Sequence, residues 1–449
     1  MSQLLNKELW IEENFGECRF GDKRLNKRLL KIVNKMSEHP ENSIPQQMGN
    51  WGDIKACYKF LRNKKVTHKR IQGQHRERIK NQNIGKVTIY LQDTSELDFT
   101  NLEESNGLGF IGNHNNKGLM FHSCLAIEPD DNNPKVHGLA NQLIWTRKNV
   151  SLTKNETRSQ RNKRARESDI WLKNLKTIGS PPEGSLWVSV GDRANDIYEF
   201  FIESKALGWE CLVRASQDRN IEVNGHETSL KSHVRSLKSK GTKEIKIRKE
   251  NETRSRNILL NITWEKIELR APQRLKKKGQ TDKLTFSVVR CWNDEENLEW
   301  ILYSSIAVET LEDAIEKIEW YAHRWIMEEY HKCLKTGCRI QLSQLETRKS
   351  LEALLGILGI VATLMLQLRN TAREEGERPA KQFVEKAALN IICKRFNLSP
   401  KISIRQFWHS VAKLGGFIGR KSDGEPGWQT LWKGWVRLTD MMWGLECYG

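Results

Sequence analysis

Three carboxylates stand at positions where they could act together. Asp93 follows the apolar segment KVTIYLQ (86–92), and Asp192 follows SLWVSVG (185–191). Both segments are predicted strands that end in an aspartate, and in open α/β sheets the residues just beyond the carboxyl ends of strands build sites. Glu328 lies in a predicted helix, YAHRWIMEEYHKCLK (321–335). Three carboxylates on rigid elements suit hard divalent cations, and two such ions activate water or a 3′-hydroxyl in phosphoryl transfer.

Each aspartate also has a structural alternative. Asp192 suits the N-cap of the helix predicted after it, and so does Asp196, because aspartate side chains accept hydrogen bonds from the first N–H groups of a helix. Asp93, in LQDTSEL, equally suits a turn. Taken singly, each is more often structural, so only the set of three indicates a metal site.

The helix predicted around Glu328 carries other polar residues. At about 100° per residue, four side chains that offer a hydroxyl, a guanidinium, a carboxylate and an ammonium share an arc of roughly 60°. On spacing alone this face is more typical of a solvated surface with salt bridges. His323 and His331 lie on the same helix, but neither has a partner at His-x₃-His spacing, so we expect exposure or phosphate contacts. The four residues are Tyr321, Arg324, Glu328 and Lys335.

The chain is strongly basic. It has 449 residues, with 74 Lys+Arg against 56 Asp+Glu and a formal net charge of +18. The length allows two or three domains, and the charge favours a polyanionic partner, because each neutralised phosphate releases counterions. A ribosomal or membrane-surface protein shares this feature, so charge favours nucleic acid without deciding it. The 16 Trp residues indicate a well-packed chain.

The cysteines and the hydropathy of the chain indicate the cellular compartment in which the protein is expected. The nine cysteines are scattered, and only Cys333 and Cys338 are close, with no second pair at zinc-finger spacing. They are interpreted as reduced thiols. The N-terminus lacks the apolar stretch of a signal peptide, and the longest uncharged run, 353–366, is shorter than the roughly 20 residues of a membrane helix. We expect a soluble, cytoplasmic protein with no membrane partner, in which 353–366 is a buried core helix.

The first 70 residues are predicted to be helical. Residues 22–38 open with Asp22 as N-cap and place apolar residues at helical spacing among basic ones, and a second helix covers 52–63. A solvated basic helix pair is one interpretation. A small DNA-binding module is the favoured one.

The remaining chain predicts a mixed α/β fold. Strands are expected at 86–93, 118–129, 137–146 and 185–192, with a polar, basic stretch at 147–168. A strand-rich region at about 206–305 contains the charged connector 274–280, a long helix follows at about 310–336, and the rest is helical. These patterns predict a helical domain at 1–70, a mixed α/β domain at 71–370 and a helical region at 371–449.

The spacing Y-x₂-R-x₃-E-x₆-K at 321–335 resembles the Tyr-Arg-Glu-Lys signature of the bacterial insertion-sequence-four family of DDE transposases, which includes the transposon-five transposase. VGDRANDI (190–197) and LQDTSEL resemble the family's second and first aspartate motifs. GDKRLNKRL and ACYKFLRN resemble its N-terminal end-binding segment, and VAKLGGFIGRKSDGEPGW its C-terminal helical region. The resemblance therefore covers nearly the whole chain.

This resemblance implies a ribonuclease-H-like core with a β-strand insertion. It implies a homodimer that acts on double-stranded DNA, namely the terminal inverted repeats and the target. Two Mg²⁺ ions, for which Mn²⁺ substitutes, would support a nick, a hairpin, its resolution and strand transfer in a cut-and-paste route. No nucleotide cofactor is expected, because GLGFIG (107–112) lies between two predicted strands without a following helix.

The resemblance also implies roles for individual residues. Asp93, Asp192 and Glu328 bind metal and are catalytic. Trp300 receives a base flipped from the duplex, and Lys59 stands where the family has an arginine, which puts a bidentate phosphate grip there in doubt. The other implied DNA contacts are Tyr321, Arg324, Lys335, Lys332, Trp325, Arg214, Arg28 and Arg62.

Two rival functions belong to other classes. One is a catalytically silent regulator that occupies transposon ends, and the other is a metal-dependent nuclease unrelated to transposition. The complete carboxylate set argues against the first. Strand joining, as opposed to cutting alone, separates the second.

Overall fold

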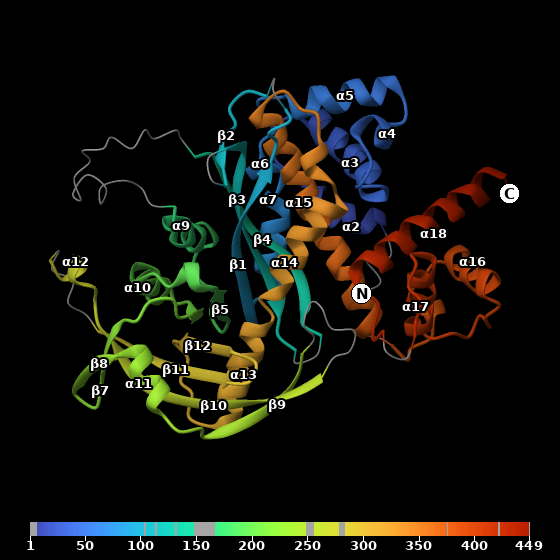
Figure 1. Cartoon of the computed structure of the whole chain (residues 1–449). Helices are drawn as coiled ribbons and strands as arrows, with labels where there is room; N and C mark the ends of the chain where they lie inside the picture. Colours follow the sequence, from blue (N-terminus) through green and yellow to red (C-terminus); the bar gives the residue numbers. More distant parts are fainter. Residues whose placement is uncertain are drawn as a thin grey trace.

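The computed structural model describes residues 7–102, 105–112, 115–130, 133–147, 167–247, 256–277, 283–374, 376–420 and 423–448. The basic stretch 147–168 lies almost entirely outside the described residues, and so does the end of the connector 274–280. The described residues form a mixed sheet flanked by helices, with helical segments toward both ends of the chain (Figure 1).

Three parallel strands form the centre of the sheet, with antiparallel strands on both sides. The centre consists of apolar segments of the kind that suits strands buried on both faces. A short strand, β2 (Gly109–Ile111), pairs with the beginning of β3. In order across the sheet the strands are β4 (Lys135–Trp145), β3 (Asn116–Glu128), and the parallel β1 (Val87–Asp98), β5 (Leu186–Gly191) and β6 (Glu210–Arg214).

The strand-rich region continues this sheet and does not form a separate one. Leu302 of β12 pairs with Arg214 of β6, so the two parts share a hydrogen-bonded ladder. Two short helices, α11 (Leu230–Ser236) and α12 (Gln273–Lys276), belong to the same region. The added strands are β12 (Leu298–Ser304), β11 (Leu284–Asn293), β10 (Arg256–Leu269), β9 (Gly241–Ile247), β7 (Asn220–Val223) and β8 (His226–Ser229).

Alternating residues of the central strands face two separate hydrophobic cores. Ile89 and Leu91 of β1 face one core, and Tyr90 between them faces the other. The second core contains residues of α9 (Asp169–Ile178) and α10 (Tyr198–Leu207). This period of two is the pattern that a strand imposes on its side chains.

The N-terminal residues 7–82 are helical (Figure 1). The predicted cap is confirmed, because the Asp22 side chain accepts a hydrogen bond from the Arg24 N–H at 2.9 Å. The predicted second helix is also present and begins one residue earlier. The elements are α2 (Lys7–Phe15), α3 (Lys23–Glu38), α4 (Ile44–Met48), α5 (Trp51–Leu61), α6 (His68–Ile71) and α7 (Gly73–Gln82).

The single long helix predicted over 310–336 is wrong. α13 (Leu311–Ala322) ends before α14 (Trp325–Lys332), which continues into a π-helical turn, η2 (Cys333–Gly337). At the break, the Arg324 and Met327 N–H groups bond to carbonyls three residues back, which is tighter than the four-residue spacing of an α-helix. The break lets α13 pack on the added strands while α14 packs on β1.

The last part of the chain is helical, as predicted. One helix, spanning Arg348–Asn370 within α15 (Arg348–Glu374), is long and apolar enough to cross a membrane, yet 94% of its most apolar window is buried inside the protein. That burial is typical of a core helix. A short turn, η3 (Ile340–Leu342), precedes α15, and the elements after it are η4 (Ala380–Gln382), α16 (Lys386–Phe396), α17 (Ile404–Leu414) and α18 (Trp428–Tyr448).

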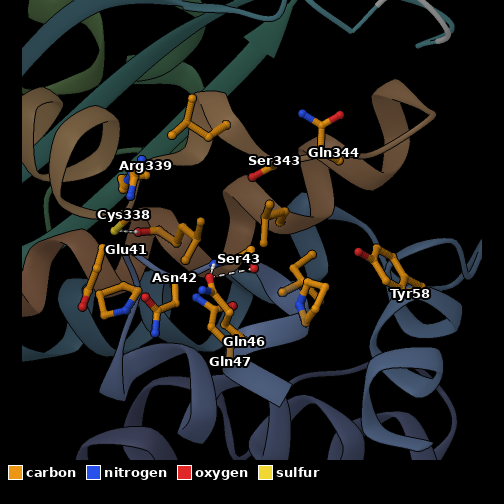
Figure 2. A pocket seen from close by; sticks show the side chains of 16 residues that line it. Glu41, Asn42, Ser43, Gln46, Gln47, Tyr58, Cys338, Arg339, Ser343 and Gln344 are labelled. Atoms are coloured by element: carbon orange, nitrogen blue, oxygen red, sulfur yellow. Dashed lines mark hydrogen bonds between the residues drawn. The ribbon is translucent and has the colours of Figure 1, made fainter. Parts of the chain in front are cut away.

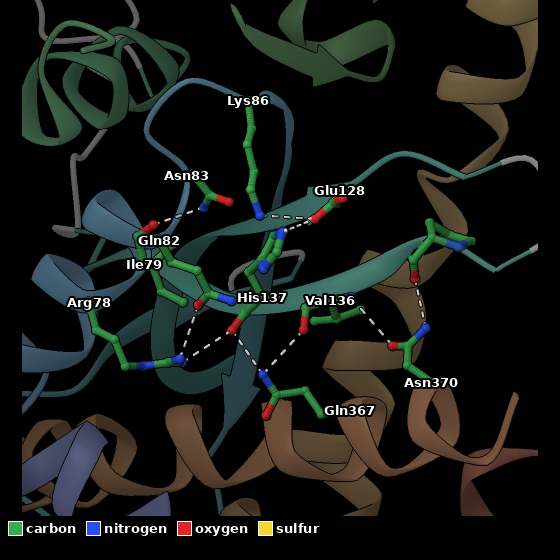
Figure 3. Close-up of polar contacts among 11 residues, drawn as sticks. Arg78, Ile79, Gln82, Asn83, Lys86, Glu128, Val136, His137, Gln367 and Asn370 are labelled. Carbon is green, nitrogen blue, oxygen red and sulfur yellow. Dashed lines mark hydrogen bonds and ion pairs between the residues drawn. The ribbon is translucent and has the colours of Figure 1, made fainter. Parts of the chain in front are cut away.

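The beginning of β4 is held by hydrogen bonds from α7 and α15 (Figure 3). The His137 carbonyl accepts hydrogen bonds from Gln367 of α15 at 2.8 Å and from Arg78 of α7 at 3.3 Å. Asn370 donates to the Pro134 carbonyl at 2.7 Å. These contacts cover a strand at the border of the sheet and satisfy backbone groups that would otherwise lack partners.

Candidate active site

Asp93 and Asp192 lie side by side because their strands are parallel and adjacent. Leu91 pairs with Val190, and each aspartate follows two residues later. The prediction that the strand ends at Asp93 is wrong, because β1 continues to Asp98 and Asp93 pairs with Ser123 of β3. β5 ends at Gly191, before it reaches the level of Asp93. Asp93 therefore has a neighbouring strand only on the β3 side.

The Asp93 carboxyl is in an environment that resists ionisation. Burial raises its pKa to about 6, and the neighbouring Asp192 and, more weakly, Glu328 raise it as well. The Thr94 N–H, which donates to Asp93 at 2.7 Å, and Arg324 act in the opposite direction. A carboxyl whose pKa is raised by neighbouring carboxylates is typical of a functional site.

The two aspartates of VGDRANDI have different surroundings. Asp192 accepts from the Ala194 N–H at 2.9 Å and caps the short 3₁₀ turn η1 (Arg193–Asn195), whereas the helix it was predicted to cap, α10, begins six residues later at Tyr198. Asp196 does not cap α10, whose N-cap is Ile197. It is buried and accepts from the Ser216 and Gln217 N–H groups and from Arg219, so it fixes the turn after β6.

The segment formed by Arg324, α14 and η2 brings Glu328 and two basic groups to Asp93. Arg324 donates to Glu328 at 2.6 Å, and its other terminal nitrogen lies 3.9 Å from Asp93. Lys335 donates to the Ser95 hydroxyl of β1 at 2.8 Å. Burial lowers the pKa of Lys335, while Glu96 and Asp93 act in the opposite direction. The π-helical turn changes the spacing after Glu328, so the predicted single arc does not describe this face.

Tyr321, Trp300 and Arg214 form a second group next to Asp192. The Tyr321 ring is buried and packs edge-to-face on Trp300, with ring centroids 5.0 Å apart. Burial raises the pKa of Tyr321, Arg214 lowers it, and Asp192 raises it slightly. Arg214 also donates to the Glu299 carbonyl at 2.9 Å. Trp300 is half-buried, so part of its ring belongs to the core and part remains accessible.

The remaining residues predicted to contact DNA lie outside these two groups. Lys332 is exposed, and Trp325 is covered on one side by the guanidinium of Arg369, 4.7 Å from its ring centroid. Arg28 pairs with Asp53 at 3.1 Å within the N-terminal helices. Arg62 pairs at 2.9 Å with Glu346, in the segment before α15.

The expectation for the two histidines is wrong. His323 and His331 are both buried, and the His331 ring packs edge-to-face on Phe121 at 5.2 Å. Burial lowers the pKa of His331 to about 3. Spacing alone did not reveal this because the break between α13 and α14 turns this side of the helix inward.

A buried hydrogen-bond network behind Asp93 was not predicted. The Gln92 side chain accepts from Asn174 of α9 at 2.7 Å, contacts His122 at 3.0 Å and donates to Ser189 at 2.7 Å. The other ring nitrogen of His122 lies 2.8 Å from the Thr94 hydroxyl. All but Thr94 are fully buried, so they fix the strand segment that carries Asp93. Polar residues inside apolar strand segments were the available signal.

The exposed face of α5 was only partly predicted. Trp51 at its start is 77% exposed, which is unusual for a tryptophan. Lys55 and Lys59 are exposed on the same helix, with Tyr58 half-buried between them and Arg62 just after the helix. At helical spacing these residues share one side, opposite the buried Cys57 and Phe60, so α5 presents an aromatic and basic surface.

The cavity drawn in Figure 2 is separate from the carboxylates. It measures about 320 Å³ and lies between the segment around Ser43 and the segment around Arg339, with Tyr58 at one end. None of the three predicted catalytic residues lines it. In the part of the chain that the structure describes, no three His, Cys, Asp or Glu side chains are grouped closely enough to enclose a metal ion.

Comparison with known proteins connects this geometry to DNA transposition. Residues 7–66 match a family model described as transposase DNA-binding, and residues 143–365 match one described as transposase DDE domain. The second match includes Asp192 and Glu328 and begins after Asp93. A solved structure with similarity is that of a piggyBac transposase synaptic complex with hairpin DNA, at 9% identity and a TM-score of 0.34. The match covers 85% of this chain and 58% of that one.

Proposed function

Because the chain carries a transposase DNA-binding domain and a transposase DDE domain, we propose that it is a DNA transposase that cuts transposon ends and joins them to target DNA. The observation that carries the proposal is the register that sets Asp93 beside Asp192, with α14 bringing Glu328 near Asp93. We further propose membership of the insertion-sequence-four family. The Tyr-Arg-Glu-Lys spacing supports this.

The carboxylates of Asp93, Asp192 and Glu328 would hold the divalent cations. The donor set suits hard cations, because it consists of three carboxylates: Asp192 and Glu328 both raise the pKa of Asp93, as its burial does, and only Arg324 opposes them as a positive charge. Two Mg²⁺ or Mn²⁺ ions held there would supply activation of the attacking oxygen and stabilisation of the leaving oxygen.

The surrounding side chains would hold the DNA in line for the reaction. Arg324 is rigidly placed by its bond to Glu328, so its planar guanidinium can grip a phosphate near the carboxylates. The Lys335 ammonium is held by its hydrogen bond to Ser95 and places a positive charge beside β1. Trp300, supported from behind by Tyr321, offers a ring face for a displaced base, and stacking of this kind recovers about 1–3 kcal/mol.

The reaction we propose has four steps. Water attacks the phosphodiester at the transposon end and frees a 3′-hydroxyl. That hydroxyl attacks the opposite strand to form a hairpin, a second water reopens it, and the new 3′-hydroxyl attacks target DNA. In each step an oxygen nucleophile forms a new P–O bond while the P–O bond to a leaving 3′-oxygen breaks, so the same carboxylates serve all four.

Further parts of the proposal concern fold and assembly. A ribonuclease-H-like core is supported by the parallel β1, β5 and β6 with antiparallel β3 and β4 beside them, and by the added strands between Asp192 and Glu328. A cytoplasmic homodimer would hold two ends together. The exposed apolar side chains of Met441, Trp443 and Leu445 on α18 support an interface there.

The test uses the inverted repeats that flank the coding region as duplex substrates, with a supercoiled plasmid as target. We expect nicked, hairpin and joined products with Mg²⁺ or Mn²⁺ and none with EDTA. Asp93→Asn and Glu328→Gln should bind the ends and leave them uncut, which controls for a contaminating nuclease. Cutting without joining would favour an unrelated nuclease, and binding without cutting by the unaltered protein would favour a silent regulator.

A further inference from the structure

Gln142 of β4 lies at the centre of a buried hydrogen-bond network that connects three parts of the molecule. Its carbonyl oxygen lies 2.9 Å from the His68 ring and accepts from Gln72 at 3.1 Å. Its amide nitrogen donates to Ser123 at 3.0 Å and to the Tyr330 hydroxyl at 3.2 Å. The side chain is almost completely buried, so these protein groups satisfy it instead of water.

The hydrogen bonds run in one direction through this network. Burial lowers the pKa of His68 to about 3, so the ring is neutral and its Nε2–H donates to Gln142. Gln142 donates to the Tyr330 hydroxyl, which in turn donates to the Gly359 carbonyl of α15 at 3.1 Å. A Cβ atom on Gly359 would lie 3.1 Å from the Gln142 oxygen, so the glycine leaves room for the network.

The two ends of the network have different functional neighbours. His68 begins α6, directly after the residues that match the transposase DNA-binding family. Tyr330 is on the inner side of α14, two residues after Glu328. Glu328 itself is 53% exposed at the side chain and is paired with Arg324, another residue of the same segment. The position of Glu328 relative to the sheet therefore depends on the contacts that the buried side of α14 makes.

We infer that His68, Gln142 and Tyr330 are positioning residues that transmit the placement of the DNA-binding helices to Glu328. The inference rests on the proposed function. If α6 moves alone, the buried Gln142 loses His68, and if Gln142 follows α6, the buried Tyr330 loses Gln142; either cost couples α6 to α14. Binding of an end by the N-terminal helices would in this way fix α14, and with it Glu328, before cleavage.

The test compares Tyr330→Phe with Tyr303→Phe in the full-length protein. Both changes remove one hydroxyl from a buried tyrosine, but Tyr303 lies on β12 among Phe201 and Phe286, outside the network. We expect Tyr330→Phe to bind inverted-repeat duplexes within about twofold of the unaltered protein and to make the first nick about tenfold more slowly in a single turnover. It should also need more Mg²⁺ for half-maximal nicking, which general destabilisation would not produce.

A double change tests whether the residues act through one path. His68→Leu together with Tyr330→Phe should be about as slow as the slower single variant, because either change already interrupts the relay. If the two losses multiply instead, the residues act independently and the inference is wrong. It is also wrong if a normally folded Tyr330→Phe nicks at the rate of the unaltered protein.

Hydrogen exchange separates this inference from the proposed function. On addition of an inverted-repeat duplex, amides of 325–335 should exchange more slowly in the unaltered protein, and this protection should be lost in Tyr330→Phe and retained in Tyr303→Phe. The measurement needs no cleavage. A protein that binds ends and never cuts them would defeat the proposed function, whereas equal protection in all three proteins would defeat the relay.

Discussion

Two charged regions of this molecule are built in opposite ways. The carboxylates lie on β1, at the end of β5 and on α14, and a fully buried network of Gln92, His122 and Asn174 supports them from behind. The basic face of α5 instead rests on apolar packing by Cys57 and Phe60, and its charges extend into solvent. Hydrogen bonds therefore fix the positions of individual side-chain atoms around the carboxylates. On α5, packing fixes the helix but not the charged side chains.

This difference predicts how each region responds to substitution. Metal-dependent chemistry requires each oxygen at its place, so the loss of one group removes the reaction. Phosphate contacts from exposed cations each add a share of affinity, so the loss of one weakens binding in proportion.

The largest effect separates two aspartates of one motif. Asp192→Asn should reduce end cleavage by at least about 1,000-fold with an unchanged melting temperature, because Asp192 is proposed to hold metal. Asp196→Ala should instead destabilise the fold by about 3 kcal/mol, because it removes a buried carboxylate that holds two backbone N–H groups and leaves the half-buried Arg219, 2.7 Å away, without its partner. Single-turnover cleavage and thermal unfolding distinguish them. Asp192→Asn that still cuts at the normal rate would remove this residue from the site.

An intermediate effect concerns pH. The pKa of Asp93 is raised to about 6, mainly by burial and then by Asp192, so below that pH a proton competes with the cation for the carboxylate. The Mg²⁺ concentration for half-maximal nicking should therefore rise about tenfold per pH unit below pH 6 and be nearly constant above pH 7. The measurement is a series of Mg²⁺ titrations of the nicking rate.

The folding contribution of the same group has a defined sign. A carboxyl whose pKa is higher in the folded than in the unfolded protein holds its proton more tightly when folded, so its contribution to stability falls as pH rises from about 4 to about 6. If the Mg²⁺ concentration for half-maximal nicking did not change between pH 5 and pH 7, the assignment of Asp93 as a metal ligand would be contradicted. Thermal unfolding at the same pH values controls for loss of fold.

The smallest effect is expected on α5 and just beyond it. Arg62→Ala should weaken end binding about threefold to tenfold and reduce the slope of log affinity against log salt by about one, with cleavage at saturating protein unchanged. Lys59→Arg should strengthen binding slightly, because a guanidinium grips phosphate through two hydrogen bonds. Filter binding at several salt concentrations measures both. A loss of cleavage at saturation in Arg62→Ala would mean that α5 is more tightly coupled to the site than its exposure indicates.

Local sequence was sufficient for the elements that depend on nearest neighbours. The Asp22 cap, the apolar spacing of α3 and the apolar runs of β1 and β5 follow from side chains within a few residues of each other. The proposed carboxylate set also came from the sequence, because strand, motif and spacing each point to the same residues. The resemblance supplied their proposed roles.

Tertiary structure decided where those elements begin, end and face. β1 runs past Asp93 because β3 continues beside it, and the predicted long helix breaks at His323 and Arg324 because its two halves pack on different parts of the sheet. The two histidines of this segment are buried for the same reason. The networks around Gln92 and Gln142 join residues far apart in the chain, such as Gln142 and Tyr330. No local pattern encodes such a pair, because a buried polar group finds its partner only once the chain has folded.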